Sequence, residues 1–305
     1  MMTLFDQQGA GLHPVYERLR DADDGSDAEQ RMYLDGLWRR ARGHLDSHFK
    51  SAFAHQIHRR FWELRLAAAL LDLGYSLEPG AGGRPDFATR LPGGERLWIE
   101  AVSPSLGLAA NPDRPADLIP NAGFRATPVD QILMRYTQAL REKRDRFQSY
   151  CEAGVVTEGD RCVIALNTGG MWPHVEGVGL PRILSAVFPI GEEQFTIDLN
   201  AGSTLSVEHP LRSEVIRANG APIALTAFLH PSYACISGLI GDSARVTGWR
   251  QQGNARFVSV ANPTAMTPLP QAWFMLGTEY RYVPEAEGFS LQQVEHQREG
   301  VLTPA

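Results

Sequence analysis

A stripe of apolar residues with helical spacing runs along the chain between residues 49 and 73. In steps of four and three residues, the stripe is formed by Ile57, Phe61, Leu64, Ala68 and Leu71. This spacing places the five side chains on one side of an α-helix, and Gly74 is a natural stop for it. Because other apolar residues surround the stripe, the helix should be packed on more than one side.

The chain before this stripe is more polar. A helix rich in Arg and Asp is predicted over 28–48. Residues 1–25 mix Gly, Pro, Asp and Gln with little periodicity, and they are predicted to be a mobile lead-in.

Short apolar runs separated by turn residues follow the stripe. They predict strands at 75–78, 86–89 and 96–103, divided by a Gly-rich turn and a Pro-Gly-Gly turn. Residues 103–127 contain four prolines and no periodicity, which is typical of a long functional loop. Such a loop could close over a substrate.

A second amphipathic helix is predicted over 128–152, and a buried strand over 162–167 follows it. This succession makes a β-α-β crossover with the strand at 96–103. A short helix is expected over 180–187, since Pro181 suits a first helical turn.

Beyond residue 190 the pattern is dominated by apolar runs typical of strands. These runs lie at 195–199, 223–229, 233–240 and 256–261. The polar end from Pro284 onward is predicted to fray.

The whole pattern predicts an α/β fold with a mixed central sheet flanked by helices. We divide the chain into a helical extension over 1–48 and a core over 49–190. The remainder, 191–305, either continues the sheet or forms a small C-terminal subdomain.

The composition is typical of a globular protein and argues against a membrane protein. The 305 residues are 43% hydrophobic, which is enough for a large core. No apolar stretch approaches the roughly 20 residues of a membrane span, and the N-terminus lacks a secretory pattern, so a cytoplasmic protein without a membrane partner is expected. The net charge of -6 argues against a generally basic nucleic-acid surface but allows a local basic face. The sequence does not indicate the oligomeric state, and a homo-oligomer stays among the alternatives.

Two residue types are scarce. Cysteine occurs only at 151, 162 and 235, without metal-ligand spacing, and these residues are predicted to be buried thiols. Lysine occurs only at 50 and 143, so a mechanism that needs a lysine has two candidates.

Two carboxylates are placed where a hairpin can join them. Asp86 opens one predicted strand, and Glu100 lies late in the next, 14 residues away. Glu100 follows Leu-Trp-Ile and precedes Ala101 and Val102, so a central strand would bury it at a high free-energy cost. Metal binding is one remedy, because Mg²⁺ prefers oxygen ligands and is held by one or two carboxylates.

Three runs carry a family resemblance: Phe61-Trp-Glu-Leu-Arg-Leu, Gly83-Arg-Pro-Asp-Phe87 and Trp98-Ile-Glu-Ala-Val-Ser-Pro104. Together they resemble the PD-(D/E)XK nuclease superfamily, in which a helix Glu, a Pro-Asp on a strand and an acidic residue two before a Lys bind Mg²⁺. Glu63, Asp86 and Glu100 match these positions in order.

The resemblance implies a restriction-endonuclease-like fold and hydrolysis of phosphodiester bonds that depends on Mg²⁺ or Mn²⁺, with DNA as the expected substrate. It makes Asp86, Glu100 and the main-chain carbonyl of Ala101 the metal ligands. Glu63 would coordinate a second ion or fix a ligating water.

The sequence departs from the family at the lysine position, where Val102 stands. Lys143 is the candidate replacement, because it belongs to an apolar stripe of the helix over 128–152. The stripe consists of Ile132, Tyr136, Leu140, Lys143 and Phe147. A lysine on an inward apolar face needs an anionic partner, which Asp86 and Glu100 would supply.

The same helix presents further polar side chains, namely Gln131, Arg135, Gln138, Arg141, Arg144 and Arg146. Gln131 and Arg135 are the expected substrate contacts. The alternative for the arginines is a solvated face with i,i+4 pairs to Glu142 and Asp145.

Three alternatives stay open. Val102 is the signature of a module that keeps the fold and binds without catalysis. A metal-independent hydrolase would use paired carboxylates as acid and base, as glycosidases do. Glu63 could simply pair with Arg59, Arg60 or Arg65, and the Lys143 ammonium could extend to water.

Overall fold

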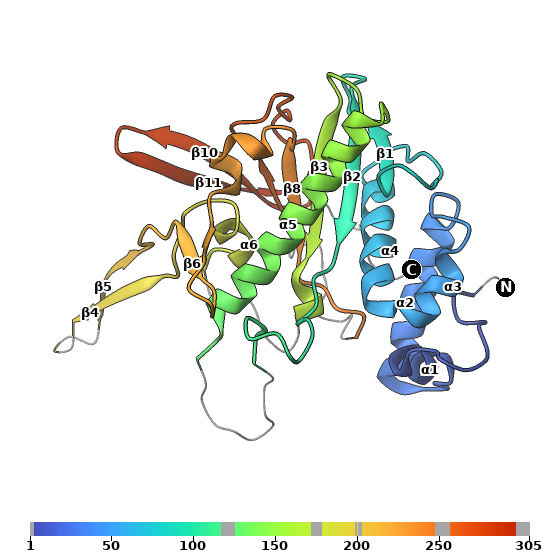
Figure 1. Ribbon diagram of the computed structural model, residues 1–305. Helices are drawn as coiled ribbons and strands as arrows, with labels where there is room; N and C mark the ends of the chain where they lie inside the picture. Colours follow the sequence, from blue (N-terminus) through green and yellow to red (C-terminus); the bar gives the residue numbers. More distant parts are fainter. Residues whose placement is uncertain are drawn as a thin grey trace.

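The computed structural model describes residues 3–116, 126–171, 179–198, 200, 203–247 and 257–296. Seven strands form one central sheet in the order β1-β2-β3-β8-β9-β10-β11 (Figure 1). They are β1 (Phe87–Arg90), β2 (Arg96–Val102), β3 (Arg161–Asn167), β8 (Gly238–Asp242), β9 (Val258–Ala261), β10 (Gly277–Glu285) and β11 (Gly288–His296). β2, β3 and β8 run parallel, as do β9 and β10, and the other neighbours are antiparallel. The mixed α/β sheet flanked by helices is therefore confirmed.

Two helices cover opposite faces of this sheet. The helix α4 (Ile57–Asp72) packs on the face that carries Leu97 and Ile99, while α5 (Val129–Glu152) packs on the face that carries Trp98. This division follows from the alternation of side chains along β2. The indole of Trp62 on α4 also donates a hydrogen bond to the Ala165 carbonyl on β3, at 2.9 Å. The predicted helix over 128–152 and the strand over 162–167 are confirmed.

The N-terminal region contradicts the predicted mobile lead-in. Three helices occupy it: α1 (Pro14–Arg20), α2 (Gly25–Ala41) and α3 (Phe49–His55). Leu4, Tyr16 and Leu19 are fully buried, and the Leu4 N–H donates to Asp35 at 2.7 Å. These residues belong to a core that includes Phe53 of α3, whose ring lies 6.3 Å from that of Tyr16, and only the tertiary structure brings them together.

The single helix predicted over 49–73 is broken. Gln56 has φ −127° and ψ 44°, outside the helical region, and separates α3 from α4. The break lets Phe49 and Phe53 of α3 pack against Trp38 and Tyr16, whereas α4 packs on the sheet.

Several strand predictions are also corrected. Residues 75–78 form no strand, although the Glu78 N–H donates to the Ala88 carbonyl at 2.9 Å. Of the strands predicted over 223–229 and 233–240, only 223–224, in β7 (Pro222–Ala224), and 238–240, in β8, are strand. Two short 3₁₀ helices, η2 (Ala227–Leu229) and η3 (Pro231–Tyr233), lie between them. Of the end predicted to fray, residues 284–296 belong to the β10–β11 hairpin, in which the edge strand is stabilised by pairing with β10, and residues 297–305 lie outside the described residues.

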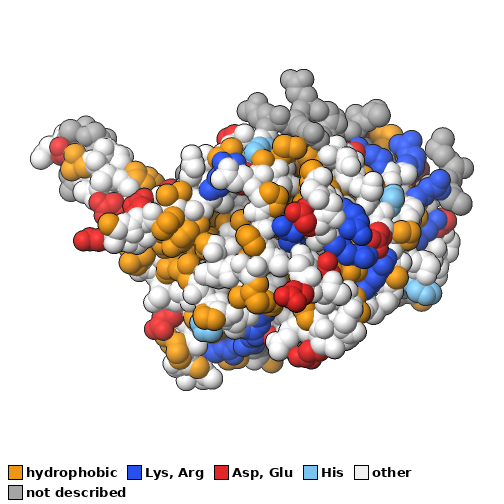
Figure 2. Space-filling model, turned by 90° about the horizontal axis from the view of Figure 1, so that it is seen from above, with side chains coloured by type: hydrophobic (Ala, Val, Ile, Leu, Met, Phe, Trp, Pro, Cys, Tyr) orange, Lys and Arg blue, Asp and Glu red, His pale blue; other side chains and the backbone are white. Residues whose placement is uncertain are grey.

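Residues after 190 contribute both to the central sheet and to two separate ribbons. The first ribbon pairs β4 (Gln194–Asp198) with β5 (Ser203–Glu208), and the second pairs β6 (Glu214–Ile216) with β7 (Pro222–Ala224). The β4–β5 arm projects from the body, with hydrophobic and acidic side chains visible on it (Figure 2). The helix predicted over 180–187 is shortened to α6 (Arg182–Ser185).

Cys162 is buried and Cys235 is half-buried, but Cys151 is exposed, contrary to the prediction that all three are buried. A 3₁₀ turn, η1 (Thr168–Met171), follows β3. Arg256, where the last of the predicted strands begins, lies outside the described residues.

Over the part of the chain that the structure describes, no helix combines the length and the apolar character needed to cross a membrane.

Candidate active site

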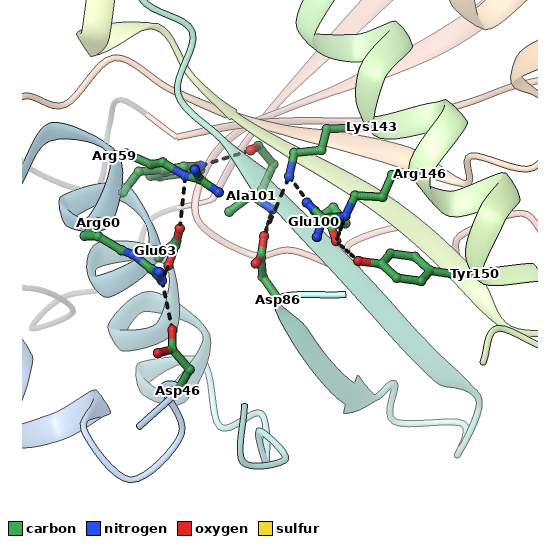
Figure 3. Close-up of polar contacts among 12 residues, drawn as sticks. Asp46, Arg59, Arg60, Glu63, Asp86, Glu100, Ala101, Lys143, Arg146 and Tyr150 are labelled. Atoms are coloured by element: carbon green, nitrogen blue, oxygen red, sulfur yellow. Dashed lines mark hydrogen bonds and ion pairs between the residues drawn. The ribbon is translucent and has the colours of Figure 1, made fainter. Parts of the chain in front are cut away.

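Glu100 and Lys143 meet between the sheet and α5. Glu100 lies near the end of β2 and points toward α5, with only 1% of its side chain exposed. Lys143 is 9% exposed and donates a hydrogen bond to Glu100 Oε2 (Figure 3). The buried lysine predicted from the helical stripe therefore has an anionic partner, and its ammonium does not extend to open water.

Two further residues of α5 contact the same carboxylate. Tyr150 donates its hydroxyl to Glu100 Oε1 at 2.8 Å, and Arg146 Nε lies 3.7 Å from that oxygen. Positions 143, 146 and 150 share one face of the helix, so one carboxylate can meet all three. Burial raises the pKa of Tyr150, which keeps its hydroxyl protonated as a donor. Sequence reasoning missed the role of Tyr150, although its spacing of seven residues from Lys143 was a usable signal.

Asp86 lies at the open end of the β1–β2 hairpin. The hairpin turn depends on Gly94, whose φ of +91° favours glycine. The first pair of the ladder is Phe87 with Ile99, so Asp86 precedes β1 and does not open it. Its Oδ2 accepts the Ala101 N–H at 2.8 Å and lies 3.9 Å from Lys143 Nζ.

Asp86 is more open to solvent than its neighbours, with 29% of its side chain exposed. Its Oδ1 makes no hydrogen bond or ion pair with a described residue. In an extended strand the N–H and carbonyl of one residue point to the same side. The Ala101 carbonyl therefore faces the same edge as Asp86, beyond the last β1–β2 pair.

Glu63 approaches Asp86 from α4, on the other face of the sheet. Its carboxylate pairs with Arg60 Nη1 at 2.6 Å and more loosely with Arg59 Nε at 3.7 Å. Arg60 Nη1 also pairs with Asp46 at 2.9 Å, a contact for which the sequence carries no local signal. Asp86 lies between Glu63 on one side and the Lys143–Glu100 pair on the other (Figure 3).

The three carboxylates influence one another through Asp86. Burial, together with the negative charge of Asp86, raises the pKa of Glu63 to about 7 despite the two arginines. Burial and Asp86 also raise the pKa of Glu100, which Lys143 partly offsets. Burial is the larger cause for both groups, and the charge of Asp86 is the second.

The structure does not gather all three acids around one point. In the described ranges, no group of three or more His, Cys, Asp and Glu side chains is close enough to hold a metal ion. Asp86 and Glu100 do share one neighbour, since both lie within 3.9 Å of Lys143 Nζ. The Asp86 and Glu100 carboxylates and the Ala101 carbonyl are oxygen donors of the kind that Mg²⁺ takes, which usually keeps several waters and one or two carboxylates. Both Glu100 oxygens also accept hydrogen bonds, from Lys143 and Tyr150.

Gln131 and Arg135 lie away from this group. Arg135 precedes Lys143 by eight residues, about 12 Å along the helix axis, and Gln131 lies a further turn away. Arg135 Nε donates to the Ser105 carbonyl at 2.9 Å, and its Nη1 donates to Gln138 at 2.8 Å. It therefore anchors the start of the long loop. Residues 117–125 of the loop, proposed to close over substrate, lie outside the described residues.

Comparison with protein-family models, curated proteins and solved structures finds no match to the chain. The proposed function therefore rests on the positions and contacts of the site residues.

Proposed function

We propose that the protein is a divalent-metal-dependent nuclease that hydrolyses phosphodiester bonds, with DNA as its substrate. The observation that carries the proposal is that Lys143 of α5 lies beside both Asp86 and Glu100. This lysine would replace the strand lysine of PD-(D/E)XK enzymes, whose position is occupied by Val102. The order helix Glu, Pro-Asp, hairpin, buried Glu and basic helix supports a restriction-endonuclease-like core.

Asp86, Glu100 and the Ala101 carbonyl would hold the ion. When bound, a divalent ion lowers the pKa of a water ligand and neutralises charge on a phosphate. Lys143 has three N–H donors and would orient the attacking water or a phosphate oxygen beside Glu100. Tyr150 fixes the Glu100 carboxylate through its hydroxyl.

Glu63 would act on a water near Asp86. Its pKa of about 7 means that it can accept or release a proton near neutral pH, which suits a group in general acid–base catalysis. Arg60 holds its carboxylate in place.

The test is cleavage of plasmid DNA and of single-stranded and double-stranded oligonucleotides with added Mg²⁺ or Mn²⁺. We expect metal-dependent cleavage by the wild type, inhibition by chelator, and loss of cleavage in Glu100→Gln and Lys143→Ala. Glu95→Gln is the matched control, because Glu95 is an exposed acid in the same hairpin. No cleavage by the folded wild type with either ion, or equal cleavage by Glu100→Gln, would contradict the proposal.

One observation favours the non-catalytic module. Glu100 is already contacted by Lys143, Tyr150 and Arg146, which is how a purely structural buried acid would be satisfied. Such a module would bind DNA in a gel-shift assay with equal affinity in wild type and Glu100→Gln, and neither would cleave.

A further inference from the structure

A cavity of about 620 Å³ lies on the side of α5 that faces away from the candidate active site. Its walls come from α5 and from the segment over 217–233. Arg141 lines it and precedes Lys143 by two residues, a rotation of about 200° around the helix. The volume is typical of small-molecule sites. This cavity is separate from the Lys143 carboxylate group.

The cavity concentrates positive charge in an acidic protein. Arg141, Arg144, Arg217 and His230 line it, and no described lining residue is Asp or Glu. The net charge of the chain is -6, so the cavity has the opposite sign to the protein as a whole. An anion would therefore be attracted to this place.

Arg141 makes no hydrogen bond or ion pair with any described residue. The acids that could have neutralised it bond elsewhere: Glu142 accepts from Gln138 at 2.8 Å, and Asp145 accepts from Arg144 Nε at 2.8 Å. The expected i,i+4 pair between Arg141 and Asp145 is therefore not formed. Arg217 is only loosely paired, since its Nη1 lies 3.9 Å from Asp113.

His230 is held so that it presents a donor. Arg144 Nη1 donates to the Ser232 hydroxyl at 3.1 Å, and the Ser232 N–H donates to His230 Nδ1 at 3.2 Å. Because Nδ1 accepts, the neutral imidazole carries its proton on Nε2. The Nε2–H is then a donor alongside the guanidinium groups.

The rest of the lining is apolar, with Met134, Pro222, Ile223 and the ring of Tyr233. Arg144 lies 5.0 Å from the centre of that ring and links the apolar wall to the cationic one. A ligand that fits both walls has an anionic group on an apolar, flat body.

We propose that this cavity binds the phosphate group and base of a nucleotide, either a free nucleoside monophosphate or the phosphorylated end of a nucleic-acid strand. Guanidinium groups match phosphate oxygens in a forked, bidentate geometry. Arg141 supplies a guanidinium with no described partner and Arg217 a loosely paired one, and the apolar wall would take the base. The cavity lies away from Asp86 and Glu100, so this binding does not depend on the proposed hydrolysis.

The test is isothermal titration calorimetry with AMP, adenosine and inorganic phosphate as probes, in the presence of chelator so that no metal site contributes. We expect AMP to bind the wild type, adenosine to bind at least about tenfold more weakly, and Arg141→Ala to weaken AMP binding at least about tenfold. Arg141 is exposed and unpaired, so this variant should fold normally. Arg90→Ala, which removes an exposed arginine from the end of β1, is the control for net charge and should bind like the wild type.

Competition between AMP and 5′-phosphorylated or 5′-hydroxyl oligonucleotides shows whether the bound phosphate belongs to a free nucleotide or to the end of a strand. Displacement by the phosphorylated strand alone would assign the cavity to strand ends, and no displacement by either strand would assign it to free nucleotides. Glu100→Gln should bind AMP like the wild type, which keeps this test independent of nuclease activity. Absence of AMP binding and of phosphate-dependent oligonucleotide binding in the wild type, or equal binding by Arg141→Ala and Arg90→Ala, would overturn the proposal.

Discussion

Among the described residues, two buried ion pairs lie on opposite faces of the central sheet, and they differ in their access to solvent. Arg65 on α4 pairs with Asp242 on β8 at 2.6 Å, and both side chains are fully buried. Lys143 and Glu100 are almost as deeply buried, but the same lysine also lies beside Asp86, whose side chain is partly exposed to solvent. Only the second pair connects to the surface through an acid.

The surroundings of the two acids show the same difference. Asp242 Oδ1 accepts the Ala244 N–H at 2.9 Å, and Tyr33 accepts from Arg65 at 3.0 Å, so this pair is closed by protein on all sides. Asp86 Oδ1 has no described partner. The closed pair offers no free oxygen to a ligand, whereas Asp86 offers one beside a buried ion pair, and the proposed metal site depends on that oxygen.

The largest effect should come from breaking the closed pair. Arg65→Met leaves Asp242 buried without its cation, and we expect a loss of about 3–5 kcal/mol in the free energy of unfolding, measured by urea denaturation. Lys50→Ala, which removes a partly exposed pair with Asp6, is the control and should cost no more than about 1 kcal/mol. Equal losses in the two variants would mean that the closed pair has no special structural role.

Lys143→Met should separate stability from activity. Glu100 keeps Tyr150 and Arg146 and can take up a proton, so the loss of stability should be smaller than for Arg65→Met. Cleavage should fall by at least about 100-fold, because a preorganised positive charge beside the reacting phosphate is removed. A variant as unstable as Arg65→Met that still cleaved DNA would assign Lys143 to the fold alone.

Glu63→Gln should change how stability depends on pH. The pKa of Glu63 rises from 4.5 to about 7 in the folded protein, so the folded state binds more protons than the unfolded state between these values. The stability contributed by the protonated carboxyl is present below about pH 4.5 and is lost as pH rises toward 7. Thermal unfolding at about pH 5 and about pH 8 should show a smaller decrease with pH in Glu63→Gln than in the wild type. An unchanged decrease would show that Glu63 does not titrate in this window.

The smallest effect is expected for Tyr150→Phe. It removes one hydrogen bond to Glu100, which is worth about 1 kcal/mol, and leaves the ring in place. Cleavage should fall by a few-fold with an unchanged metal requirement. A loss as large as that of Lys143→Met would mean that Tyr150 acts on the substrate directly.

The parts of the site that were predictable are those with a local signal. The helical stripe placed Lys143 on the inward face of α5, and the Pro-Gly-Gly turn placed Asp86 near Glu100. Periodicity gives the face of a helix but not which half of a long helix faces the acids, so it could not show that Gln131 and Arg135 lie away from Lys143 along α5. Their contact with substrate stays a prediction.

Long-range contacts explain what the sequence could not predict. The polar β11 strand is held by its pairing with β10, and Leu4 is buried by a core that includes Phe53. The arginine-lined cavity needs a wall over 217–233, which begins 65 residues beyond the end of α5, and no pattern along the chain indicates that they meet. Each of these features depends on tertiary packing that local propensity does not encode.

The most direct measurement is Mn²⁺ binding to the protein, followed by electron paramagnetic resonance of the free ion. The wild type should bind Mn²⁺, and Asp86→Asn, which keeps the size of the side chain and removes the open carboxylate, should bind it at least about tenfold more weakly. Equal Mn²⁺ affinity in the wild type and Asp86→Asn would contradict a metal-dependent site at Asp86 and Glu100.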